Sequence, residues 1–175
     1  MDFFKSIVNI WDSSPTSQPV SNSDKYVRSA SPEPRHQNTV SITELESRIN
    51  VQINRHRNNL GLKSVERVGQ LDQIALEHSE SMKRLDRLSH DGASERHSQV
   101  IRTGLETGFG ENCARGECEE WEFPEEFDLL VPGWIKSLGH KEVLETDAFT
   151  HTGIGFAVKK EGSRIYYYAT QIFAV

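Results

Sequence analysis

Cysteine is scarce in this chain, which has only Cys113 and Cys118 among its 175 residues. Two cysteines cannot build the disulfide-dense scaffold that stabilises many small secreted domains. Their spacing also differs from the CxxC pattern of zinc and redox motifs. The sequence is compatible both with one short-loop disulfide and with two free thiols, because spacing alone does not determine pairing.

Long apolar runs are missing as well. No stretch approaches the roughly 20 apolar residues that a membrane-spanning helix needs. None forms the apolar core of about 7 to 15 residues that marks a secretory signal peptide either. We therefore expect no transmembrane segment, and a chain that either stays inside the cell or leaves it by a route that the sequence does not display.

An excess of positive charge is the third absence. The formal net charge is -6, so there is no general electrostatic reason to bind nucleic acid, and we expect no nucleic-acid partner. The remaining composition, with 35% hydrophobic and 26% charged residues, is ordinary for a globular protein. A chain of 175 residues is long enough for one domain with a substantial core.

Two segments precede the expected domain. In residues 1–12, apolar side chains recur at helical spacing, which favours a short amphipathic helix that docks on the domain or on a partner. Residues 13–40 contain four prolines among many polar residues. That composition offers too little apolar surface to offset the entropy of ordering, so we predict a flexible linker before a domain over residues 41–175.

Helical patterns dominate the first part of that domain. Ser41 as N-cap, with Glu44 three residues later, predicts the start of a helix that Gly61 ends. A second apolar stripe starts near Gln70. His78 lies within this stripe, and we interpret it first as a histidine packed in the core.

His90 is the first candidate site residue. It precedes Asp91-Gly92, a dipeptide that favours a turn because Asp bonds local backbone and Gly tolerates positive φ. That turn would leave the imidazole outward-facing at a helix end. A weaker helical pattern follows over residues 94–103, with Val100 and Ile101 as its expected buried positions.

Glu111 is the second candidate. It lies between Gly108-Phe109-Gly110 and Asn112-Cys113-Ala114, in a small and partly apolar run that does not require a solvated side chain. Taken alone, a Gly-Glu-Asn sequence is usually just a loop. A glutamate placed there nevertheless indicates a specific partner.

The next stretch changes character. Residues 117–128 are acidic and aromatic, which predicts an exposed loop because like charges repel. A helix is expected over residues 125–137, kinked or split at Pro132-Gly133 and ended at Gly139-His140. Extended patterns over residues 152–158 and 164–173 then predict an antiparallel hairpin, so the fold class is α+β.

Several short motifs occur together in one order along the chain. They are Asn54-x-x-Arg57, Gly61-Leu62, Ser89-His90-Asp91-Gly92, Gly110-Glu111-Asn112, Trp134-x-x-Ser137-x-Gly139-His140, Gly153-x-Gly155 and Gln171-x-Phe173. Over residues 41–175 this combination resembles the CAP superfamily of cysteine-rich secretory, antigen 5 and pathogenesis-related proteins, also called SCP-like. The resemblance is closest to its compact prokaryotic members. It implies a three-layer α-β-α sandwich, with the C-terminal hairpin in the sheet and a shallow cleft on one side.

By motif position, the resemblance places His90, Glu111 and His140 in that cleft. Ser137 stands where fuller members carry a second glutamate, so the family's set of four is reduced to three. His78, Ser137 and His151 are candidate neighbours of the cleft. The matching Arg57, Trp134, Gly153 and Gly155 are interpreted as structural residues: a partner for a carboxylate or for backbone carbonyls, a core anchor, and two sites of close packing.

Two imidazoles and one carboxylate form a ligand set suited to Zn²⁺ or another divalent metal. The same side chains could instead hydrogen-bond one another and hold the cleft in shape. We therefore consider two functions. One is a non-catalytic or weakly metal-binding module that binds a lipid, glycan, peptide or protein partner at the cleft.

The alternative is a metal-dependent, peptidase-like hydrolase with Glu111 as ligand or base, which the missing second carboxylate weakens. Enzyme status is thus left open, leaning against catalysis. The family resemblance favours an extracytoplasmic or secreted location, with the cytoplasm as the alternative.

Overall fold

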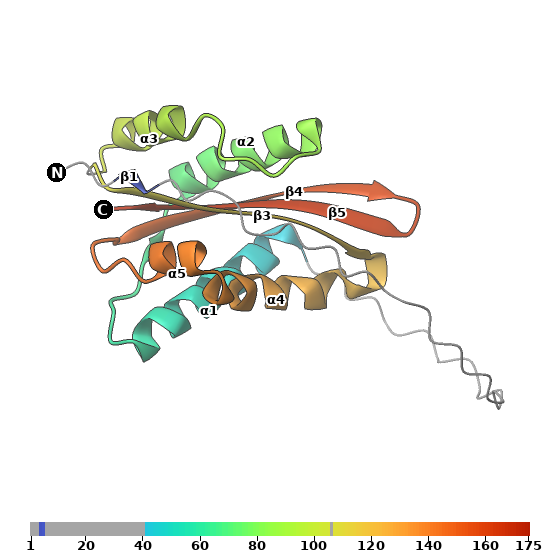
Figure 1. Ribbon diagram of the computed structural model, residues 1–175, viewed down its shortest axis with the longest axis horizontal. Helices are drawn as coiled ribbons and strands as arrows, with labels where there is room; N and C mark the ends of the chain where they lie inside the picture. Colours follow the sequence, from blue (N-terminus) through green and yellow to red (C-terminus); the bar gives the residue numbers. More distant parts are fainter. Residues whose placement is uncertain (1–3, 6–40, 106) are drawn as a thin grey trace.

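A five-stranded mixed sheet lies at the centre of the computed structural model, which describes residues 4–5, 41–105 and 107–175. Helices α2 and α3 cover one face of the sheet, and α1, α4 and α5 cover the other (Figure 1). This arrangement confirms the α+β class and the predicted α-β-α sandwich. The helices are α1 (Ile42–Asn59), α2 (Gly69–Leu85), α3 (Ala93–Arg102), α4 (Phe123–Lys136) and α5 (Leu138–Leu144), with a 3-10 helix, η1 (Glu120–Glu122).

The predicted C-terminal hairpin forms the middle of the sheet. The strands are β1 (Phe4–Lys5), β2 (Glu66–Arg67), β3 (Phe109–Glu119), β4 (His151–Glu161) and β5 (Arg164–Ala174), in the spatial order β1-β3-β5-β4-β2. β5 pairs antiparallel with both β3 and β4, while the short β1 and β2 pair parallel at the edges. Gly162, with φ of +62°, makes the tight turn between β4 and β5.

Two glycines of β4 determine how closely α2 lies on the sheet. A Cβ atom added at Gly153 would lie 2.2 Å from the backbone carbon of Leu71, and one added at Gly155 would lie 2.2 Å from the backbone nitrogen of Leu76. Only glycine leaves room for helix backbone at these distances. The close-packing interpretation of both glycines is therefore confirmed.

On the opposite face, α1 begins where the sequence predicts, because the Ser41 hydroxyl accepts a hydrogen bond from the Glu44 N–H at 3.2 Å. Near the end of α1, the fully buried guanidinium of Arg57 donates to backbone carbonyls. They belong to Lys63, Leu144, Thr146 and Phe149. Arg57 therefore binds carbonyls rather than a carboxylate, and it ties α1 to the loop before β4. Trp134, 3% exposed, packs in the core on this face, as expected.

The N-terminal helix predicted over residues 1–12 is wrong at the two residues that can be judged. Phe4 and Lys5 are extended and pair with Phe109 and Gly110 of β3. In this position they supply hydrogen-bonding partners to an otherwise open sheet edge. The other residues of that segment, and the linker expected over 13–40, lie outside the described residues.

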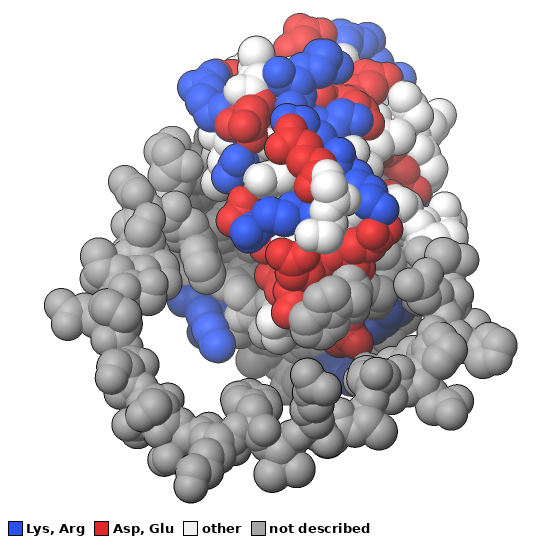
Figure 2. All heavy atoms as spheres, turned by 90° about the vertical axis from the view of Figure 1, so that its right-hand side faces the viewer, with Lys and Arg blue, Asp and Glu red and all other residues white. Residues whose placement is uncertain are grey.

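The acidic stretch at residues 117–128 is not the exposed loop that its charge predicted. β3 continues to Glu119, η1 follows directly, and α4 begins at Phe123. Basic side chains of the hairpin offset the repulsion: Lys160 lies 2.5 Å from Glu120 and Arg164 lies 2.9 Å from Glu117. Figure 2 shows this end of the molecule, where basic and acidic side chains alternate above an acidic group.

The split that is expected at Pro132-Gly133 as an alternative to a kink does not occur. α4 runs through Pro132 to Lys136, and the chain becomes extended at Ser137, with φ of −91° and ψ of 119°. Burial of Val131 and Trp134 beside the proline offsets the lost intrahelical hydrogen bond. Gly139 and His140, expected to end the helix, instead belong to α5. No helix in the described part of the chain combines the length and the apolar character needed to cross a membrane.

Candidate functional site

The candidate site lies between the sheet and the layer of α2 and α3. His90 sits in the turn between these helices, where the Asp91 N–H donates to the Ser89 hydroxyl and Gly92 adopts φ of +77°. The predicted turn is thus confirmed, but the expected outward-facing imidazole is wrong: the His90 side chain is 10% exposed and is turned inward, because it is hydrogen-bonded to the buried carboxylate of Glu111. Glu111 and Cys113 are two positions apart on β3, so their side chains lie on the same face of the sheet, toward the layer of α2 and α3.

Glu111 is buried, with a side chain only 1% exposed, and is held by three hydrogen bonds. Arg96 donates from Nε to Oε2 at 2.5 Å and from Nη2 to Oε1 at 2.7 Å, which makes a bidentate ion pair. His90 Nδ1 lies 2.7 Å from Oε1. Burial pushes the pKa of Glu111 upward, but the hydrogen bonds from His90 and Arg96, with the charge of Arg96, hold this pKa at about 2.

The ionised carboxylate also determines the tautomer of His90. A carboxylate only accepts hydrogen bonds, so the proton of a neutral His90 ring is on Nδ1 and its lone pair is on Nε2. The structure therefore brings two of the three predicted site residues into direct contact.

Arg96 is the functional residue that sequence reasoning missed. Besides Glu111, it binds the carbonyl oxygens of Asp91 at 2.8 Å and of His90 at 3.4 Å, so it connects the turn to the sheet. The signal was the helical spacing of Ala93, Arg96 and Val100, all of which are buried. Ile101, expected inside, is 42% exposed, and Arg96 occupies the inward face instead. An arginine on such a face requires a buried partner.

His140 lies on α5, and its position differs from that of the other two predicted residues. Its Nδ1 atom is buried and has no hydrogen-bond partner among the described residues. Its backbone carbonyl accepts from Asn112 at 3.3 Å, and its ring lies 6.4 Å from that of Trp134. Burial, together with the charge of His90, lowers the pKa of His140 to about 4, so this imidazole is neutral near pH 7.

The three candidate neighbours are placed differently. His78, 6% exposed, lies beside Glu111, and its Nε2 is 2.7 Å from the carbonyl oxygen of Ser89. Ser137 is the residue between α4 and α5. His151 begins β4, and its ring contacts the Thr150 hydroxyl at 2.8 Å. Within the described part of the chain, no hydrogen bond joins Ser137 or His151 to His90, Glu111 or His140.

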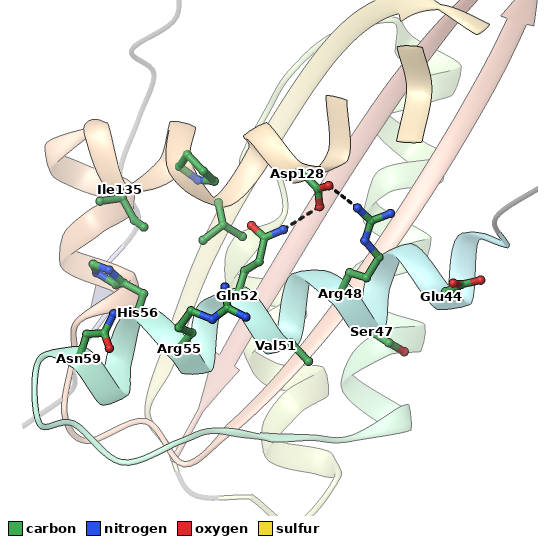
Figure 3. Close-up of a pocket in the computed structure, with 12 residues that line it drawn as sticks. Glu44, Ser47, Arg48, Val51, Gln52, Arg55, His56, Asn59, Asp128 and Ile135 are labelled. Atoms are coloured by element: carbon green, nitrogen blue, oxygen red, sulfur yellow. Dashed lines mark hydrogen bonds and ion pairs between the residues drawn. The ribbon is translucent and has the colours of Figure 1, made fainter. Parts of the chain in front are cut away.

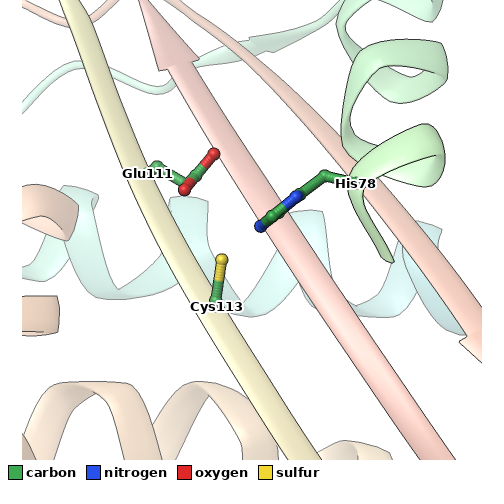
Figure 4. A group of neighbouring side chains, drawn as sticks. All are labelled: His78, Glu111 and Cys113. Atoms are coloured by element: carbon green, nitrogen blue, oxygen red, sulfur yellow. The ribbon is translucent and has the colours of Figure 1, made fainter. Parts of the chain in front are cut away.

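Cys113 completes a buried group with His78 and Glu111. One ligand atom from each lies within 4.8 Å of the others, and the three side chains point toward one space between α2 and β3 (Figure 4). By residue type and distance this group could hold a metal ion. Burial and the charge of Glu111 raise the pKa of Cys113 well above the usual value of a thiol, so the uncharged form is present.

A separate groove lies on the other side of the molecule, between α1 and α4 (Figure 3). Its volume is about 720 Å³. The Asp128 carboxylate at its rim accepts hydrogen bonds from Arg48 and Gln52. Val51 and Arg55 also line the groove and are exposed. The sequence did not predict this groove, because it depends on the spacing of two helices far apart in the chain.

Comparisons with known proteins agree with this architecture. An outer surface protein of Borrelia burgdorferi shares 18% identity and a TM-score of 0.57, over 77% of this chain and 95% of that one. An extracellular protein containing an SCP domain from Bacillus anthracis shares 23% identity and a TM-score of 0.59, over 83% of this chain and 45% of that one. A cysteine-rich secretory protein from Staphylococcus aureus shares 16% identity and a TM-score of 0.51, over 82% of this chain and 41% of that one.

This chain thus spans less than half the length of two of these proteins, and identities this low speak for the fold alone. No curated protein sequence matches the chain. The model of the cysteine-rich secretory protein family, CAP, matches residues 52–173. The match covers most of the domain, including every residue of the buried group around Glu111, and the chain therefore belongs to the CAP family.

Proposed function

We propose that this chain is a non-catalytic CAP-domain module that binds a lipid, glycan, peptide or protein partner. The ion pair between Arg96 and Glu111 carries the proposal. A general base needs an accessible oxygen and a pKa near the working pH. Both oxygens of Glu111 are occupied, its side chain is 1% exposed, and its pKa of about 2 makes it a weak base. The chain thus has a buried structural carboxylate at the position where a hydrolase would need a reactive one.

One observation favours a metal-dependent hydrolase as the second candidate. Among the described residues, His140 has a buried Nδ1 without a hydrogen-bond partner, and its lowered pKa makes the imidazole neutral near pH 7. Neutral imidazoles are good zinc ligands. Such an enzyme would still lack a base, because Glu111 is engaged by Arg96.

Two surfaces can receive the partner. At the predicted cleft, His90 and His140 are partly exposed residues, whereas Glu111 is buried. The groove between α1 and α4 has a volume of about 720 Å³, which is typical of ligand sites. The groove combines apolar Val51 with the charged groups of Arg55 and the Arg48–Asp128 pair.

The binding test uses the full chain against three defined probes: phosphatidylcholine–phosphatidylglycerol vesicles, soluble peptidoglycan fragments and a displayed peptide library. Biolayer interferometry compares the wild type with His90→Ala/His140→Ala and with Val51→Asp/Arg55→Glu. We expect the wild type to retain at least one probe, and one variant to lose at least tenfold in affinity while keeping its melting temperature. A wild type that retains none of the probes would refute a lipid, glycan or peptide partner.

Turnover is tested separately with peptide and ester substrates, with added Zn²⁺ and with a chelator. We expect no hydrolysis above that of a His90→Ala/His140→Ala sample. Zinc-dependent hydrolysis that this variant loses would establish the hydrolase instead.

We further propose an extracytoplasmic or secreted location. Family membership supports it, as do the descriptions of the similar Borrelia and Bacillus proteins as outer surface and extracellular. Fractionation of source cells with an antibody against the domain tests it, and recovery with cytoplasmic markers only would contradict it.

A further inference from the structure

A cation is already present at the buried group of His78, Glu111 and Cys113. The guanidinium of Arg96 lies 2.5 Å and 2.7 Å from the two carboxylate oxygens of Glu111. Its side chain is 8% exposed, so the charge is held inside the protein rather than at its surface. Two backbone carbonyls of the His90–Asp91 turn accept its remaining hydrogen bonds.

The other two side chains of the group are also bonded to protein groups. The buried Sγ atom of Cys113 lies 4.0 Å from the Thr170 hydroxyl, within hydrogen-bond distance for sulfur. The Nε2 atom of His78 is directed at the Ser89 carbonyl, an acceptor, and therefore carries the proton of that ring, which leaves a lone pair on Nδ1 alone. A zinc ion would thus have to draw a thiolate from Cys113 and a carboxylate oxygen away from Arg96.

The guanidinium also performs the structural tasks of a bound ion. It neutralises the only carboxylate of the group, and it connects residues from β3 and from the turn before α3. A divalent ion at this place would add its charge to that of Arg96 at short range in a poorly solvated region, where repulsion between like charges is strong. The present residues therefore do not fit a metal ion.

We propose that the guanidinium of Arg96 takes the place of a metal ion at this group, so that the wild-type chain holds no divalent ion among His78, Glu111 and Cys113 and needs none to fold. This inference rests on the proposed function in treating Glu111 as structural. It disagrees with the metal site that the ligand types and distances of this group suggest. Removal of the guanidinium leaves a buried carboxylate beside a thiol and an imidazole, which is a set that attracts a metal ion.

The experiment compares the metal-free wild type with Arg96→Ala, Arg96→Lys and Arg96→Ala/Cys113→Ser. Titration with Co²⁺ is followed in the near ultraviolet, where a thiolate–cobalt charge-transfer band reports Cys113 as a ligand. Melting temperatures are measured with and without Zn²⁺ at about 100-fold excess over the dissociation constant of the variant. We expect the band only in Arg96→Ala, together with a zinc-dependent rise in its melting temperature of roughly 5–10 °C.

Two control variants test whether the positive charge at position 96 prevents metal binding and whether the Cys113 thiol is the metal ligand. Arg96→Lys keeps a cation and should show no band, and the double variant should lose the band because it lacks the thiol. A cobalt band in the wild type that Cys113→Ser abolishes would overturn the inference. So would an Arg96→Ala protein that shows no band, or one that stays unfolded when refolded with Zn²⁺. A metal-binding wild type would leave the binding results for vesicles, glycans and peptides unaffected, so the two proposals fail separately.

Discussion

At the scale of single residues, the buried charge of Glu111 is stable in the fold because neighbouring side chains compensate it. Its side chain is 1% exposed, and its charge is compensated by Arg96 and by the His90 hydrogen bond. Removing one member of such a pair leaves the other as an uncompensated buried charge, whereas removing both costs much less. The stability of this region therefore depends on the pair.

Glu111→Gln should destabilise the fold by about 3–5 kcal/mol, because it leaves the buried guanidinium of Arg96 without a compensating charge. The double variant Arg96→Met/Glu111→Leu should regain at least half of that loss. Urea unfolding followed by circular dichroism at pH 7 gives both values. Additive losses in the double variant would show that the two side chains do not act as a pair.

His140 gives the molecule a pH dependence of known sign. Its folded-state pKa of about 4 lies below the ordinary 6.5, so the unfolded chain binds a proton more readily between these values. Stability from the neutral imidazole is therefore fully present above pH 6.5 and is lost as the pH falls toward 4. His140→Gln should flatten this decline relative to the wild type, as urea midpoints at pH 7.5, 5.5 and 4.5 would show. Parallel curves would contradict the assignment.

His90 and Glu111 could be singled out from the sequence because their local sequence is unusual. His90 precedes a turn dipeptide, and Glu111 interrupts a run of small residues. Arg96 is marked only by its helical spacing with Ala93 and Val100, and its role depends on a carboxylate fifteen residues away, which that spacing does not reveal. The burial of Glu111 could not be predicted from the local sequence either, because only the sheet register shows which face of β3 the helices cover.

At the scale of elements, the contact between α2 and β4 sets the geometry of the helix layer that carries His78. The helix lies directly on Gly153 and Gly155, with no side chain between the backbones. Any Cβ atom there must displace the helix. A change at these glycines should therefore move one wall of the buried group.

Gly155→Ala should destabilise the protein by about 3 kcal/mol, the upper part of the usual range for overpacking, because the contact is with backbone. Gly133→Ala is the matched control, since a Cβ atom there meets nothing within 4 Å and the residue lies inside α4. That control should stabilise by about 0.5–1 kcal/mol. Thermal unfolding of both variants tests the pair, and equal effects would count against the packing explanation.

The helices α1 to α3 could be predicted because their apolar positions recur over several turns. β3 was harder, since it contains glycines and alternating charges whose burial depends on its neighbour β5. α5 was missed because Gly139 suggests a helix end. Both depend on contacts distant in sequence, which a local pattern does not contain.

At the scale of the whole molecule, the side chains of β3 face two helix layers, one on each side of the sheet. Cys113 and Cys118 lie five positions apart on this strand, so they face opposite layers. Along a strand this spacing is about 16 Å, far beyond the reach of a disulfide. Both cysteines are free, which rules out the short-loop disulfide.

Cys113 should therefore report on opening of the whole fold. In a Cys118→Ser variant, the remaining thiol is 1% exposed and should react with a thiol reagent at least 100-fold more slowly than in the denatured chain. Its labelling rate should rise with urea in parallel with global unfolding. Fast labelling without denaturant would instead show that the layer of α2 and α3 opens on its own.

The strand order has a consequence for the sequence in which the parts of the domain can assemble. β4 and β5 follow every other strand of the sheet along the chain, yet β2 and β3 each use one of them as a partner. The strands and helices that come before the hairpin therefore have no complete sheet to pack on until the hairpin joins them. A domain interrupted before His151 should remain open, and closure of the sheet should coincide with docking of the hairpin.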